Sequence, residues 1–221
     1  MVSGDTRLTL EIWSDVVCSW CYIGKRHLER ALAEMPERDQ MAIRWRSFEL
    51  DPSMAADGGL ADEELARRRG ITLEDARAMH EVTERQGAEL GIVFDFRRAR
   101  RGNTFDAHRV LHMAADHGVQ EAVKERLLAT YFTEGGAIGD RDTVTAAAEQ
   151  GGLDRAAVAA MLESERYAAE VRGDEREAAE LGISAVPFFV IDRRYGLAGA
   201  QPPAILVAAL RRALADRSVS A

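Results

Sequence analysis

The chain has 221 residues, of which 47% are hydrophobic and 30% charged, enough for one large domain or one domain that carries an insertion. Its net charge of -8 argues against a broad electrostatic surface for nucleic acid. The N-terminus lacks the pattern of a secretory signal, and no apolar run approaches the roughly 20 residues of a membrane helix. We therefore expect a cytoplasmic protein with neither nucleic acid nor membrane as a partner.

The N-terminal part predicts a strand, a helix and a second strand. Residues 7–13 alternate between apolar and polar side chains, as a half-buried strand does. An amphipathic run follows Cys18 and Cys21 and ends before Pro36. Residues 41–50 alternate again. The cysteine pair is therefore expected at the point where a strand turns into a helix.

Residues 52–165 show only helical signals. Thr72 looks like the capping residue of a long helix, and Asn103 or Thr104 can cap the next. Asp140 and Asp154 are expected to open two more. This stretch predicts an all-helical block without a repeat.

The last part predicts one more helix, two strands and a final helix. The charged run 165–181 is closed by Gly182, and 183–192 reads as a loop that enters a buried strand. Residues 195–199 form a short last strand, and Pro202 or Pro203 suits the first turn of the closing helix.

The order βαβ, helical block, ββα indicates an α/β fold of the thioredoxin type, interrupted by a large all-helical insertion. We assign residues 1–52 and 166–221 to the thioredoxin-like domain and 53–165 to the insertion.

The spacing of the only two cysteines suits reversible disulfide chemistry, because two intervening residues let the sulfurs meet within one helical turn. A helix N-terminus favours a thiolate and can lower a cysteine pKa from roughly 8.5 to roughly 3.5–7.5. We predict that Cys18 is the exposed attacking nucleophile and Cys21 the resolving thiol. Ser19 and Trp20 lie between them, and the large ring of Trp20 is expected to contact the insertion or a substrate.

A zinc site is the main alternative for this pair. The chain has no further cysteine, but His108 and His112 lie four residues apart on one predicted helix face, so a Cys2His2 set is formally possible. We favour redox chemistry and predict no metal.

Three motifs resemble the DsbA-like thioredoxin family, in particular its FrnE-like branch: residues 15–24, 103–109 and 182–189. The resemblance extends from about Arg7 to Leu214 and implies that Val186 and Pro187 face the dithiol. It further implies that Pro187 is cis and that Val186 offers its backbone to an extended substrate. A simple loop terminator is the alternative for this proline.

The same resemblance leaves two kinds of enzyme to be distinguished. The related 2-hydroxychromene-2-carboxylate isomerases and kappa-class glutathione transferases carry serine at the first cysteine position and use glutathione. Because Cys18 and Cys21 are both present, we favour a protein disulfide oxidoreductase that acts on thiols or disulfides of proteins or peptides. A glutathione-dependent isomerase or transferase is the second hypothesis, and a non-enzymatic chaperone or zinc-binding module the third.

Asn103 and His108 are candidates for a supporting role near the dithiol. A histidine there can stabilise a thiolate or relay a proton, whereas helix capping and packing are the structural alternatives. No cofactor is expected, and glutathione stays open as a co-substrate. Reaction direction, natural substrate and oligomeric state, a homodimer included, are left open.

Overall fold

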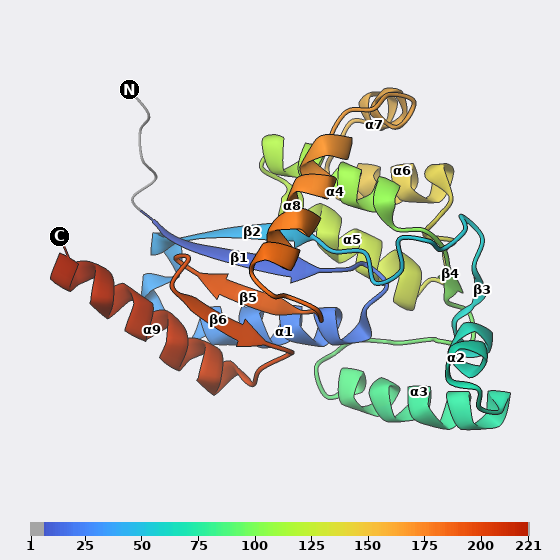
Figure 1. Cartoon of the computed structure of the whole chain (residues 1–221), viewed down its shortest axis with the longest axis horizontal. Coiled ribbons are helices and arrows are strands. Elements are labelled where there is room, and N and C mark those ends of the chain that lie inside the picture. The colour runs from blue at the N-terminus through green and yellow to red at the C-terminus, as the bar shows by residue number, and fades with distance from the viewer. Residues whose placement is uncertain (1–6, 221) are drawn as a thin grey trace.

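The computed structural model describes residues 7–220, and Figure 1 shows the arrangement of their elements. The strands are β1 (Leu8–Ser14), β2 (Met41–Ser47), β3 (Gly59–Leu60), β4 (Arg100–Arg101), β5 (Phe188–Ile191) and β6 (Tyr195–Ala198). The helices are α1 (Ser19–Ala33), α2 (Ala61–Arg69), α3 (Leu73–Ala88), α4 (Phe105–Asp116), α5 (Gln120–Phe132), α6 (Arg141–Gln150), α7 (Arg155–Leu162), α8 (Ala168–Glu180) and α9 (Pro203–Ser220), with a 3₁₀ helix η1 (Pro36–Gln40). No helix in this described range is long and apolar enough to cross a membrane.

The main sheet has the strand order β2-β1-β5-β6, with β1 and β2 parallel and the other pairs antiparallel. Alternation along β1 separates its two faces. Leu8, Leu10 and Ile12 pack with α1 and α9, whereas Trp13 packs with α8 on the opposite face. The sheet is therefore covered on both sides, and the predicted α/β fold of the thioredoxin type is confirmed.

The helices α4 to α7 lie beside one end of the sheet (Figure 1). Their shared core also takes in Val16, Val17, Tyr22 and Ile23, which flank the two cysteines. The dithiol segment thus lies where the sheet and the helical block meet.

The helical block contains one feature that the sequence did not indicate. β3 and β4 form a two-stranded antiparallel ribbon, extended by a hydrogen bond from Gly58 N to Arg101 O of 2.9 Å. Strands of two residues are too short to show alternation, so the expectation of helices alone in this stretch was wrong.

Helix starts follow the predicted capping side chains in three cases. The Thr72 hydroxyl accepts from Asp75 N in a capping box, and the carboxylates of Asp140 and Asp154 accept from backbone N–H groups in the first turns of α6 and α7. At α4 the N-cap residue Thr104 makes no such bond, whereas the other predicted capping residue, Asn103, accepts from Phe105 N at 2.9 Å.

One side chain closes part of the edge of the sheet at β2. Trp45 N donates to Oε1 of Gln120, and Nε2 of Gln120 donates back to Trp45 O, both at 2.9 Å. The amide of Gln120 therefore satisfies the backbone groups that the neighbouring strand of a wider sheet would bond.

An ionic cluster ties the dithiol helix α1 to α5 of the insertion. The ammonium of Lys25, which is buried, lies 2.7 Å from Glu121 and 2.8 Å from Glu125, and also pairs with Glu29. Arg26 pairs with Glu125 as well, and the Tyr22 hydroxyl donates to it at 2.7 Å. Burial alone would raise the pKa of Glu125, but these partners lower it to about 2.

We expect this cluster to make stability fall at acid pH. The unfolded chain binds the proton of Glu125 first, because its pKa there is near 4.5 and in the folded protein about 2. The contribution is present above pH 4.5 and is lost as pH falls toward 2. Since the side chain is 31% exposed, we expect a loss of roughly 1–2 kcal/mol after solvent screening.

Urea unfolding between pH 6 and pH 2 would measure this loss in wild type and Glu125→Gln. The variant should be less stable at pH 6 and should lose less on acidification. Parallel curves for the two proteins would contradict the assignment.

Candidate active site

The two cysteines lie where β1 gives way to α1. Cys18 is the N-cap residue of α1 in an extended conformation, and its carbonyl accepts from Cys21 N at 3.0 Å and Tyr22 N at 3.3 Å. Cys21 is therefore in the first helical turn. This placement confirms the predicted strand-to-helix position of the pair.

Both sulfurs are free thiols and both are buried, with Cys18 7% exposed and Cys21 0% exposed. The expectation of an exposed Cys18 was wrong, because the backbone of Val186 covers it. Cys18 is still the member of the pair that reaches the surface.

The two sulfurs titrate together as one pair. The neighbouring Cys21 sulfur and burial raise the pKa of Cys18. Burial by itself raises the pKa of Cys21. The interaction with Cys18 and the positive charge of Lys124 outweigh burial and bring this pKa below its usual value.

Val186 and Pro187 form the wall opposite the dithiol. The Val186–Pro187 peptide bond is cis, and the Cys18 thiol donates to Val186 O across 3.6 Å. Pro187 O accepts from Gly199 N at 2.8 Å, which fixes the turn to the end of β6. Cys18 and Val186, which lie 168 positions apart in the sequence, are therefore in direct contact.

Gly24 lets α1 pass close to this wall. A Cβ atom at Gly24 would lie 3.0 Å from Pro187 Cγ and 3.5 Å from Phe189 Cζ. A side chain here would therefore push Pro187 away from Cys18.

A pair of glycine substitutions tests this close approach. Glycine to alanine within a helix ordinarily stabilises by roughly 0.5–1 kcal/mol. Gly173→Ala in α8, where the nearest atom to an added Cβ is 3.9 Å away, should gain that amount. Gly24→Ala should gain nothing, and Gly24→Leu should lose about 1–3 kcal/mol through overpacking. Equal gains at both sites in urea unfolding would show that α1 and Pro187 are not in tight contact.

Asp15 and His108 form a buried pair below the dithiol. Nε2 of His108 lies 3.3 Å from Oδ1 of Asp15, whose two oxygens also accept from Val16 N at 2.7 Å and Leu50 N at 2.8 Å. Burial would raise the pKa of Asp15, but His108 and Leu50 N–H lower it. His108 therefore acts on Asp15, and the backbone carbonyl of Asp15 accepts from Cys18 N at 3.4 Å.

Asn103 is engaged elsewhere. Its Nδ2 donates to Glu49 and to Pro52 O, and its Oδ1 accepts from Phe105 N at 2.9 Å. These bonds hold the segment after β2 against the start of α4. In the described residues Asn103 contacts neither sulfur.

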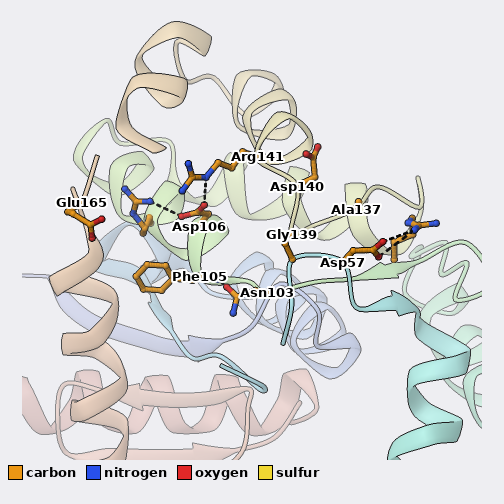
Figure 2. A pocket seen from close by; sticks show the side chains of 12 residues that line it. Asp57, Asn103, Phe105, Asp106, Ala137, Gly139, Asp140, Arg141 and Glu165 are labelled. Atoms are coloured by element: carbon orange, nitrogen blue, oxygen red, sulfur yellow. Dashed lines mark hydrogen bonds and ion pairs between the residues drawn. The ribbon is translucent and has the colours of Figure 1, made fainter. Parts of the chain in front are cut away.

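Asn103 also lines a cavity of about 770 Å³ in the insertion (Figure 2). Within it Asp106 lies between two arginines, 2.7 Å from Arg109 and 2.8 Å from Arg141. All its lining residues fall between Ala56 and Glu165, so this pocket belongs to the insertion and not to the dithiol.

Ser19 and Trp20 continue the site toward solvent. Ser19 is half-buried in the first turn of α1, and Trp20 is 47% exposed. An exposed indole beside a nucleophile offers apolar contact area to a docking chain.

Among the described residues no three His, Cys, Asp or Glu side chains gather as a metal site requires. Nε2 of His112, a candidate zinc ligand in the sequence, lies 3.1 Å from Oδ2 of Asp174.

One residue that acts on the pair, Lys124 of α5, was not predicted from the sequence. It is fully buried, and its charge acts on Cys21, Asp15 and Cys18. The available signal was its position between Val123 and the buried pair Leu127 and Leu128 on the apolar face of the helix.

Several solved structures are similar to this chain over most of its length. A crystal structure of a probable DsbA oxidoreductase from Streptomyces coelicolor is similar at 40% identity and a TM-score of 0.89, covering 95% of this chain and 91% of that one. The cytosolic disulfide reductase DsbM from Pseudomonas aeruginosa, solved with GSH, has 21% identity and a TM-score of 0.61, over 92% and 99%. A 2-hydroxychromene-2-carboxylate isomerase shares the fold at 15% identity and a TM-score of 0.65, over 96% and 99%.

The model of the DSBA-like thioredoxin domain matches residues 9–211, which include the main sheet, the dithiol, the helical insertion and the first half of α9. The chain belongs to the DSBA-like thioredoxin domain family.

Proposed function

We propose that this protein is a thiol–disulfide oxidoreductase that works through the Cys18-Ser19-Trp20-Cys21 dithiol. The observation that carries the proposal is the contact of the Cys18 thiol with Val186 O beside the cis bond to Pro187. It puts a nucleophile next to a backbone edge that an extended peptide can pair with. Substrates are therefore protein or peptide chains with a thiol or a disulfide.

The reductive cycle has two exchange steps. The reduced pair gives up one proton, and the Cys18 sulfur attacks a substrate disulfide, forms a mixed disulfide and releases one substrate thiolate. Cys21 then gives up its proton and attacks the Cys18 sulfur, which releases the second substrate thiolate and leaves a Cys18–Cys21 disulfide. Two electrons pass from the dithiol to the substrate. The oxidative cycle runs these steps backward.

Trp20 and Val186 are the proposed substrate-binding residues. Backbone pairing at Val186 fixes the direction of the peptide, and the exposed ring of Trp20 covers apolar side chains beside the reacting sulfur. This surface does not require one particular substrate sequence.

The test is an insulin-reduction assay together with a dithiol-oxidation assay, on wild type and Cys18→Ser. Wild type should turn over in at least one direction, and Cys18→Ser in neither. Equal activity of the two proteins in both assays would refute the proposal.

Glutathione is proposed as the co-substrate that returns the pair to its starting state. The support is the fold shared with DsbM, whose structure was solved with GSH. The name of that protein also suggests the cytoplasm as the location. Glutathione binding without any redox cycling of Cys18 and Cys21 would instead favour a glutathione-dependent isomerase or transferase.

A further inference from the structure

Leu50 is an apolar side chain close to the dithiol that the exchange steps above do not use. It follows β2 and is 37% exposed. Its backbone N donates to Oδ2 of Asp15 at 2.8 Å, and the backbone carbonyl of Asp15 accepts from Cys18 N at 3.4 Å. Asp15 therefore bonds both the segment of Leu50 and the residue that carries the attacking sulfur.

The two residues before Leu50 are anchored in the protein. Phe48 and Val186 both pack against the same small core cluster between the sheet and α8. The side chain of Glu49 is 0% exposed and pairs with Arg172 of α8 at 2.5 Å. Because both preceding residues are held, the segment is fixed close to Val186, and Leu50 is the member of it that remains exposed.

Two residues of the motif 103–109 hold this segment from the insertion. Nδ2 of Asn103 donates to Oε1 of Glu49 at 3.3 Å. Nε2 of His108 lies 3.3 Å from Oδ1 of Asp15, and since a carboxylate only accepts hydrogen bonds, this nitrogen is the donor. His108 is fully buried, and its Nδ1 has no hydrogen-bond partner among the residues that the structure describes. The polar contact of the ring is therefore made to Asp15.

We propose that Leu50 is a specificity-determining residue, which contacts an apolar side chain of the substrate next to the cysteine that reacts with Cys18. The proposal rests on the function proposed above and names the substrate class. A single exposed leucine is ordinary on a protein surface, but this one is held beside the reacting thiol by buried groups. An extended peptide paired with the backbone of Val186 turns successive side chains to opposite faces, so that those on one face reach Leu50.

In this arrangement the insertion determines how Leu50 is presented to the substrate. His108 acts through Asp15, and Asn103 acts through Glu49. Among the described residues neither His108 nor Asn103 contacts a sulfur, so both are positioning residues. Their loss should weaken the binding of apolar substrates and leave the redox equilibrium of the dithiol unchanged.

The test compares two synthetic peptides with two cysteines each, one with leucine and the other with glycine beside both cysteines. They are supplied as disulfide or dithiol, whichever form the wild type turns over. We expect the KM of the wild type to be about tenfold lower for the leucine peptide, which is about 1.4 kcal/mol, the order of partly burying a leucine side chain. Leu50→Ser should remove this preference. A preference that persists in this variant would overturn the proposal.

Leu73→Ser is the matched control, because Leu73 at the start of α3 is also 37% exposed. This variant should keep the preference of the wild type for the leucine peptide. Equal losses of preference in Leu50→Ser and Leu73→Ser would mean that Leu50 has no special place at the site.

Conservative and disruptive changes test the positioning residues. His108→Gln can place an amide N–H where Nε2 of His108 donates and should keep the leucine preference. His108→Leu and Asn103→Ala should reduce it, through KM and not through kcat. Added to Leu50→Ser, His108→Leu should cause no further loss, because both changes remove the same contact. Additive losses in KM would overturn the positioning role.

The equilibrium of the dithiol with reduced and oxidised glutathione separates this proposal from the function itself. It should be the same in wild type and Leu50→Ser, and a shift would contradict a role in substrate binding. A wild type that turns over neither peptide would refute the proposed function. An active wild type without a leucine preference would refute the role of Leu50 alone. Since Leu50 is exposed, its serine variant should fold even where the His108 variants do not.

Discussion

A Cys21→Ser variant is expected to accumulate a mixed disulfide between Cys18 and its substrate and to lose turnover by roughly 1,000-fold. The resolving thiol reacts within the molecule, and well-placed intramolecular groups reach effective molarities of roughly 10⁵ M or more. Serine cannot attack a disulfide, so only a thiol from solution can release the substrate. Mass spectrometry of the quenched, unreduced reaction would show the covalent complex.

The matched control for this trap is Cys18→Ser. Its remaining thiol, Cys21, is fully buried, so a substrate disulfide cannot reach it. We expect no covalent complex in this protein. A complex of equal yield in both variants would contradict the assignment of attack to Cys18 and resolution to Cys21.

Replacing Arg46 with methionine is expected to cost about 3–5 kcal/mol of stability, the range for breaking a buried ion pair. Arg46 joins β2 to β1 and α8, with Nε 2.7 Å from Glu11 and Nη1 2.7 Å from Asp174. Both carboxylates are buried, so removal of the guanidinium leaves them with fewer partners. The melting temperature should fall by roughly 10 °C.

Arg44→Met provides the comparison for this loss. Arg44 lies two residues earlier on β2 and is exposed, so the same change should stay within about 0.5 kcal/mol. Thermal and urea unfolding of the two variants at neutral pH would separate the effects. Equal losses would mean that Arg46 contributes no more than a surface arginine.

The position of the dithiol could be predicted because local rules determine it. An alternating strand, two cysteines three apart and a helical period together specify a thiol pair at a helix N-terminus. Pro187 was identified because it precedes a buried strand in a family pattern. The capping residues Thr72, Asp140 and Asp154 also act within one turn of their own helices.

The electrostatics of the site could not be predicted in the same way. Lys124 acts on the pair through its buried positive charge, although it lies on α5, 103 residues after Cys21 in the sequence. Sequence patterns place a lysine on the surface of a helix by default. For Asn103 the sequence left two roles open, and the structure shows helix capping, because its Oδ1 accepts from Phe105 N in the first turn of α4 while its Nδ2 donates to Glu49 and Pro52 O.

The amide of Gln120 has a consequence for how copies of this chain can associate. A partner that adds a strand to the sheet at β2 would have to displace both bonds between Gln120 and Trp45. That leaves only Met41 to Arg44 of β2 for such pairing, a stretch as short as β6 (Tyr195–Ala198), the strand at the other edge of the sheet. Each edge of the sheet therefore offers only a short stretch of free backbone, which disfavours dimers and aggregates that grow by strand addition.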